Sequence, residues 1–113
     1  MECDSIFDVR FLPNPHYVPS LKGLTGKSQA VQKYIYKNDE AMVFTDKLID
    51  LLCYTIPLYV NEGKPHLIIG IGCTGGRHRS VAIALALEER LKNNGQSVLI
   101  RHRDIHKKAY HES

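Results

Sequence analysis

Apolar and polar residues follow two different periods along the first half of the chain. Residues 5–11 alternate and are rich in β-forming side chains, which predicts a first strand. Apolar residues that recur three and four positions apart predict helices over about 28–37 and 40–60, and Pro57 is expected to kink the second or end it early. Between the strand and the first helix, prolines and glycines predict a long non-repetitive loop as far as Lys27.

The second half of the chain has the pattern of a βαβ unit. Residues 66–72 form an unbroken apolar run, typical of a strand buried on both faces of a parallel sheet. An amphipathic helix from about Arg77 or His78 to Leu91 follows, and residues 97–100 predict a last strand. This order predicts a small three-layer α/β sandwich with a mostly parallel sheet. Ligands bind such sheets at the carboxyl ends of the strands, where we expect residues 13–17, 72–80 and 101–103.

The composition fits one globular domain. The chain has 113 residues, of which 43% are hydrophobic and 24% charged, and its net charge of +3 excludes a disordered protein. Three cysteines without a CxxC pair exclude a disulfide framework, and we expect neither a metal nor another cofactor. No apolar stretch reaches the roughly 20 residues that span a bilayer, and the acidic start does not resemble a signal peptide. We therefore expect a cytoplasmic protein with no membrane partner.

Positive charge is concentrated in the second part of the chain. Residues 1–69 carry 7 Lys/Arg and 8 Asp/Glu, whereas residues 70–113 carry 8 and 4. An anion is therefore expected to bind the C-terminal part. The basic residues near the end predict a contact with RNA, and a solvated tail is the alternative. The expected RNA-binding residues are Arg101, Arg103, Lys107 and Lys108.

A glycine-rich segment between the apolar strand and the next helix contains the candidate chemistry. Gly75 and Gly76 allow the backbone to approach a ligand, and successive N–H groups at a helix start can hold an anion. Arg79 offers a guanidinium fork for phosphate, and the hydroxyls of Thr74 and Ser80 add donors. We expect a phosphate-binding loop, whereas a tight turn with solvent-facing side chains is the alternative.

The same segment leaves a catalytic alternative open. From Cys73 to Ser80 it has the spacing Cys-x5-Arg-Ser, which resembles the loop of cysteine-dependent phosphatases, in which a thiolate attacks phosphorus. Gly72 stands where those enzymes have histidine, and no general-acid loop is evident, although Asp8 and Asp104 are candidates. We favour a structural role for Cys73 as a small residue buried beneath the loop.

Two other candidate ligand residues have simpler explanations. Asp8 and Arg10 flank Val9 on the predicted first strand and point to the same face, so they are expected to form an ion pair if Asp8 does not contact a ligand. His16 follows two prolines, and its alternative role is that of a turn residue packed on Tyr17.

Four motifs lie along the chain in a fixed order: Phe7–Pro15, Leu24–Gly26, Ile71–Val81 and Arg101–Arg103. Together they resemble the RapZ/YvcJ family of nucleotide-binding proteins. The resemblance implies that residues 1–113 form a single domain, the C-terminal α/β domain of a longer protein whose N-terminal P-loop kinase-like domain is absent. The chain has no G-x-x-x-x-G-K-[ST] sequence, so the ATP or GTP binding of the family is not expected here.

The resemblance implies a ligand-sensing and interaction domain, without an enzymatic activity of its own. In the RNase adapter of that family, the C-terminal domain senses glucosamine 6-phosphate, contacts small regulatory RNA and self-associates. For other relatives, another amino-sugar metabolite or a nucleotide is the alternative ligand. The implied partners are a phosphorylated amino sugar, RNA, an RNase or other regulatory protein, and a second copy of the chain. The implied ligand site consists of His16, Thr74, Gly75, His78 and Arg79, with Asp8, Cys73, Gly76 and Ser80 beside them. A purely structural oligomerisation module is a further alternative.

Overall fold

Three parallel strands form the sheet of this protein. The computed structural model describes residues 3–64, 67–93 and 98–104. The strand order is β1-β2-β3, and the register places Ser5 opposite Ile69 and Ile69 opposite Ile100. The predicted α/β class with a parallel sheet is confirmed. The strands are β1 (Ser5–Asp8), β2 (Leu67–Cys73) and β3 (Val98–Asp104).

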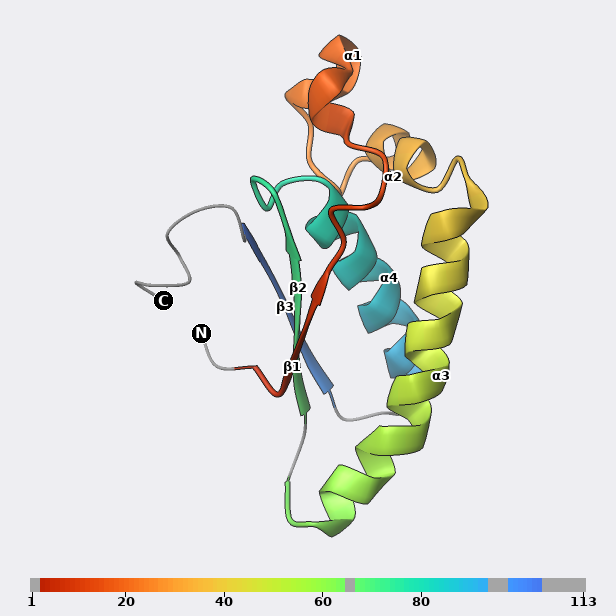
Figure 1. The fold of residues 1–113 in the computed structure, drawn as a ribbon, viewed down its shortest axis with the longest axis vertical. Helices are drawn as coiled ribbons and strands as arrows, with labels where there is room; N and C mark the ends of the chain where they lie inside the picture. Colours follow the sequence, from red (N-terminus) through yellow and green to blue (C-terminus); the bar gives the residue numbers. More distant parts are fainter. Residues whose placement is uncertain (1–2, 65–66, 94–97, 105–113) are drawn as a thin grey trace.

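The helices connect the strands on one side of the sheet (Figure 1). Helix α4 lies against β2 and β3, and α3 lies against α4. Two parallel crossovers of the same hand, taken in the order 1-2-3, place their helices on the same face. The prediction was a three-layer sandwich. The described residues form the sheet and the layer of helices on this side of it. The helices are η1 (Pro15–Tyr17), α1 (Pro19–Lys22), α2 (Gln29–Ile35), α3 (Asp39–Asn61) and α4 (Arg79–Asn93).

The hydrophobic core lies between the sheet and the helices. In β2 every residue except Ile68 is buried, as expected of a central strand. Ile69 and Ile71 from β2 and Ile83 and Leu87 from α4 are fully buried. Burial of each such side chain contributes about 1.5–3 kcal/mol, so the position of β2 relative to α4 is firmly held. The loop that joins these two elements therefore starts and ends on rigid supports.

The N-terminal third differs from the prediction in two ways. The first strand ends at Asp8 rather than residue 11, because the Asp8 carboxylate accepts the backbone N–H of Arg10 and turns the chain. The region predicted as a non-repetitive loop contains η1 and α1, each of which begins with a proline. Proline suits this position because the first N–H of a helix has no intrahelical partner.

Two later boundaries also differ from the prediction. Pro57 does not end α3, which continues to Asn61. The last strand ends at Asp104 rather than residue 100, since it pairs along the whole length of β2. The basic segment 101–103 therefore lies within β3 and not beyond the carboxyl edge of the sheet. The other helices and strands lie within about two residues of their predicted ends.

Candidate functional site

The backbone N–H groups of the loop between β2 and α4 have no hydrogen-bond partner among the residues that the structure describes. The loop begins after Cys73 and ends at Arg79, the first residue of the 15-residue helix α4. Gly75 and Gly76 have φ angles of 83° and 63°, which other residues rarely adopt, and a Cβ at Gly75 would meet nothing within 4 Å. Within the described part of the chain, no backbone N–H of residues 74–79 donates to an acceptor. Such a group of N–H donors at the positive end of a helix favours an anion.

Two cationic or polar side chains at the start of α4 are buried with unsatisfied nitrogens. His78 is 5% exposed and Arg79 is 4% exposed. Among the described residues, His78 Nε2 and Arg79 Nε have no hydrogen-bond partner. A buried N–H without an acceptor is unfavourable by about 1–3 kcal/mol, and more when the group is charged. An anion held by the loop would supply the missing acceptors.

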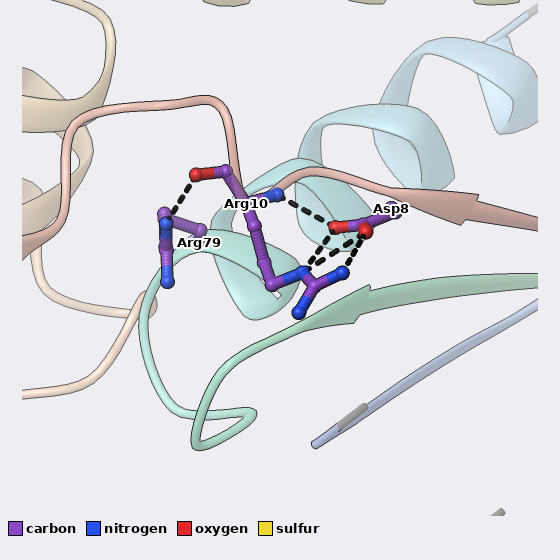
Figure 2. A network of polar contacts seen from close by, with 3 residues as sticks. All are labelled: Asp8, Arg10 and Arg79. Carbon is purple, nitrogen blue, oxygen red and sulfur yellow. Dashed lines mark hydrogen bonds and ion pairs between the residues drawn. The ribbon is translucent and has the colours of Figure 1, made fainter. Parts of the chain in front are cut away.

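Hydrogen bonds from Arg79 join the β2–α4 loop to the segment that follows β1. Arg79 Nη1 donates to the carbonyl oxygens of Arg10, at 2.7 Å, and Leu12, at 3.3 Å. Figure 2 shows the Arg79 guanidinium beside the Arg10 backbone, with the β2–α4 loop below. Arg79 therefore positions the carboxyl ends of two neighbouring strands, while its buried Nε has no hydrogen-bond partner among the described residues. This anchoring joins residues nearly seventy positions apart, which local sequence patterns do not reveal.

Asp8 and Arg10 form the predicted ion pair. The Arg10 guanidinium donates through Nε and Nη2 to both carboxylate oxygens of Asp8, and the shortest distance is 2.7 Å (Figure 2). The hydrogen bonds from the Arg10 side chain hold the pKa of Asp8 below its ordinary value. Because Asp8 lies opposite Gly72 in the register, the pair sits at the start of the glycine loop. Both side chains are about half exposed and accessible to a ligand.

Cys73 and Ser80 hold the two ends of the loop together. The Cys73 thiol donates to Ser80 Oγ at 3.1 Å, and the Ser80 backbone N–H donates to Cys73 Sγ at 3.2 Å. Both residues are fully buried. A thiolate nucleophile must reach phosphorus, so the burial of Sγ favours the structural role of Cys73 over catalysis.

The segment from Gly23 to Gly26 packs against the residues at the start of α4. The Gly26 N–H donates to the Arg77 carbonyl at 2.8 Å, and Arg77 Nη2 donates to the Gly23 carbonyl at 3.1 Å. A Cβ at Gly26 would lie 2.4 Å from the His78 carbonyl oxygen and 2.5 Å from the Ala82 nitrogen. Only glycine allows this approach of two backbones. The sequence reasoning missed this role, although Gly26 stands in one of the four family motifs.

The other residues predicted for the ligand and RNA sites that lie within the described ranges belong to the loop, η1 and β3. Thr74 and Gly75 are exposed on the loop, whereas His16 is exposed on η1 and makes an edge contact with Tyr17, with ring centroids 5.5 Å apart. His16 forms no hydrogen bond with the loop among the described residues. Arg101 is exposed in the middle of β3, opposite Gly70. Arg103 lies opposite Gly72 in the register, and Lys107 and Lys108 lie outside the described residues.

Other kinds of site find no support in the described ranges. No three His, Cys, Asp or Glu residues there are grouped so that they could hold a metal ion. None of the helices in those ranges is long and apolar enough to cross a membrane.

The family of the chain follows from a comparison of its whole length with known families. The model of the RapZ C-terminal domain matches residues 1–106. The chain belongs to this family. The match covers both halves of the candidate site, the end of β1 and the loop before α4, and it confirms the resemblance drawn from the four motifs.

Nucleotide-binding proteins of other organisms are similar to almost the whole chain. A nucleotide-binding protein of Finegoldia magna is 53% identical over 104 residues, which are 92% of this chain and 36% of that protein. One of Caldanaerobacter subterraneus is 54% identical over 105 residues, 93% of this chain and 37% of that protein. The chain thus spans little more than a third of the length of these relatives. These nucleotide-binding proteins are therefore much longer than the chain described here.

Proposed function

We propose that this domain senses a phosphorylated small metabolite, which it binds at the loop between β2 and α4, and that occupancy controls its association with RNA or protein. One observation carries the proposal: at the start of α4, the buried nitrogens His78 Nε2 and Arg79 Nε have no hydrogen-bond partner among the described residues, and neither do the backbone N–H groups of the adjoining loop. A phosphate supplies several acceptor oxygens and a negative charge, which match this set of donors.

The rest of the ligand is proposed to lie toward the end of β1. The Asp8 carboxylate there offers acceptors for hydroxyl and ammonium groups, and the Arg10 guanidinium offers donors. A phosphorylated amino sugar such as glucosamine 6-phosphate carries all the complementary groups. It is also the ligand that the family resemblance implies.

A nucleotide is the competing ligand suggested by the names of the relatives. Its phosphates suit the same loop. However, residues 1–113 contain no G-x-x-x-x-G-K-[ST] sequence, and the relatives are almost three times longer than this chain. We therefore propose that nucleotide binding belongs to the other part of those longer proteins.

Isothermal titration calorimetry of the 113-residue chain tests the proposal. Glucosamine 6-phosphate is compared with glucosamine, inorganic phosphate and ATP, and released phosphate is assayed in the same mixtures. We expect saturable binding of glucosamine 6-phosphate, weaker binding of phosphate and no turnover. Absence of binding by every phosphate compound would overturn the assignment of the loop.

A variant within the loop and a matched control on β3 sharpen the test. The substitution His78→Phe keeps the volume of the ring but removes Nε2, and it should weaken phosphosugar binding by about 10-fold to 100-fold, as for the loss of one charge-assisted hydrogen bond. His102→Phe is the matched control, since it makes the same change at a histidine that is exposed on β3, opposite Ile71. Equal affinity of both variants would place the ligand elsewhere. Thermal unfolding verifies that each variant is folded.

The assay of released phosphate also tests the alternative that the chain is a cysteine-dependent phosphatase. If Cys73 attacked phosphorus, the wild-type chain would release phosphate and Cys73→Ser would abolish that release. For the proposed sensor, the wild-type chain releases none, and Cys73→Ser retains most of its affinity because a hydroxyl can still bond with Ser80.

A further inference from the structure

The side chain of Gln32 joins helix α2 to the glycine that packs against the start of α4. Gln32 Nε2 donates to the Gly26 carbonyl at 2.8 Å, in a partly buried hydrogen bond. The Gly26 N–H donates in turn to the Arg77 carbonyl, also at 2.8 Å. These two bonds form the Gln32 bridge, which connects α2 to the β2–α4 loop.

The Gln32 bridge fixes the orientation of the peptide unit between Arg77 and His78. This unit is trans, so its C=O and N–H point in opposite directions. Because the Arg77 carbonyl points to Gly26, the His78 N–H points away from Gly26. That N–H is one of the loop donors that have no partner among the described residues. The bridge therefore orients one donor of the proposed anion site.

Other contacts hold Gly26 close to α4 but do not reach its carbonyl group. Arg77 Nη2 donates to the Gly23 carbonyl at 3.1 Å, and a Cβ at Gly26 would lie 2.5 Å from the Ala82 nitrogen. Within the described ranges, Gln32 is the only residue that donates to the Gly26 carbonyl. Without this donor, a partly buried acceptor is left unsatisfied, which favours a rotation of the backbone toward water. The orientation of the loop donor therefore depends on Gln32.

We infer that Gln32 is a positioning residue of the β2–α4 loop, which holds the His78 N–H in the direction of a bound phosphate without touching the ligand itself. The inference rests on the proposed function, since it requires that the loop bind an anion. A donor that is fixed before binding does not have to be ordered when the ligand arrives, so the affinity is higher. Binding and the Gln32 bridge are then coupled, and the ligand stabilises the bridge by the same factor.

Calorimetric titration of the 113-residue chain with glucosamine 6-phosphate and with inorganic phosphate tests the inference. Gln32→Met keeps the length of the side chain but removes its N–H donors. The affinity for both compounds should fall about 3-fold to 10-fold, as for the loss of one hydrogen bond. Gln29→Met is the matched control: it makes the same change at an exposed residue at the start of α2 and should leave the affinity unaltered. Thermal unfolding verifies that both variants are folded.

Amide hydrogen exchange, followed by nuclear magnetic resonance, separates positioning from a general loss of stability. A general loss accelerates the exchange of all core amides together, including that of Leu87, which is fully buried in α4. Loss of the Gln32 bridge accelerates the Gly26 N–H more strongly than the Leu87 N–H. We expect this selective acceleration in the ligand-free chain with Gln32→Met and not with Gln29→Met. Because no ligand is added, this measurement examines the bridge directly.

The possible outcomes distinguish the positioning role of Gln32 from the proposed function. If the wild-type chain binds neither compound, the proposed function and the inference both fail. If the wild-type chain binds them and Gln32→Met binds them equally well, the inference fails alone and the loop keeps its assignment. Equal losses of affinity in the two methionine variants, or equal acceleration of Gly26 and Leu87, would also overturn the positioning role.

Discussion

Gly26 shows how a single residue without a side chain determines the position of a loop. Its Cα faces the backbone of α4 so closely that a Cβ would overlap the His78 carbonyl oxygen. We predict that Gly26→Ala lowers the free energy of unfolding by at least about 2 kcal/mol, because neither backbone can move aside easily. Urea unfolding measures this change. Gly23→Ala is the control: Gly23 has a φ of −84° and open space around it, so its substitution should be nearly neutral.

The Asp8–Arg10 ion pair gives a residue-scale prediction about pH. Its hydrogen bonds lower the pKa of Asp8 in the folded state, so the pair stabilises the protein above the pKa of the unfolded chain. This contribution is lost as the pH falls through the lowered, folded-state pKa. Because the pair is about half exposed, Asp8→Asn should lower stability at pH 7 by less than about 1 kcal/mol. Chemical denaturation across the acid range should show the difference vanishing; a difference that persists at low pH would contradict this cause.

At the scale of elements, a buried hydrogen bond joins the end of α2 to α3. Thr45 is 1% exposed; its hydroxyl donates to the Ala41 carbonyl at 2.7 Å and shares a hydrogen bond of 3.0 Å with the Tyr36 hydroxyl. Tyr36→Phe should therefore lower the free energy of unfolding by about 0.5–1.5 kcal/mol at pH 7. Thermal or urea unfolding measures this change, and Tyr54→Phe, with its ring 71% exposed, is the control.

The same tyrosine makes the connection between α2 and α3 sensitive to alkali. Burial, the largest cause, raises the pKa of Tyr36 above its ordinary value of 10.0. A raised pKa means that the stabilisation is present below the pKa of the unfolded chain and is lost as the pH rises through the folded-state pKa. Wild-type stability should thus fall toward that of Tyr36→Phe above about pH 10. A constant difference between the two proteins across this range would be the contrary result.

Elements with a strong local pattern could be predicted from the sequence, and contacts between distant segments could not. The apolar run of β2 and the amphipathic pattern of α4 identified both elements and the loop between them, because periodicity reflects burial directly. The end of β1 was placed three residues too late, since the turn depends on the Asp8 side chain. Nothing local indicates that Arg79 binds the carbonyl of Arg10, or that Gly26 meets His78. These contacts depend on the assembled fold.

At the scale of the whole molecule, positive charge is concentrated in residues 70–113, and Arg101 is exposed on β3. If RNA binds through Arg101, the affinity should fall steeply with added salt, and Arg101→Gln should reduce the salt slope by about one unit. Arg90→Gln is the control, because Arg90 on α4 is paired with Asp46 of α3 at 2.6 Å. Filter binding at several salt concentrations measures both slopes. Equal slopes for the two variants would exclude Arg101 from the contact.

The parallel pairing of β1 with β2 also has a consequence for how the chain folds during synthesis. Asp4 accepts the backbone N–H of Ile68, which is made 64 residues later, and Ser5 pairs with Ile69. At about 5–20 residues per second, the first strand is made roughly 3–13 s before its partner. Helices α2 and α3 can form in that interval from local contacts, whereas Ile6 and Phe7 must wait unpaired. Ile6 and Phe7 are therefore open to aggregation or chaperone capture until β2 has been made.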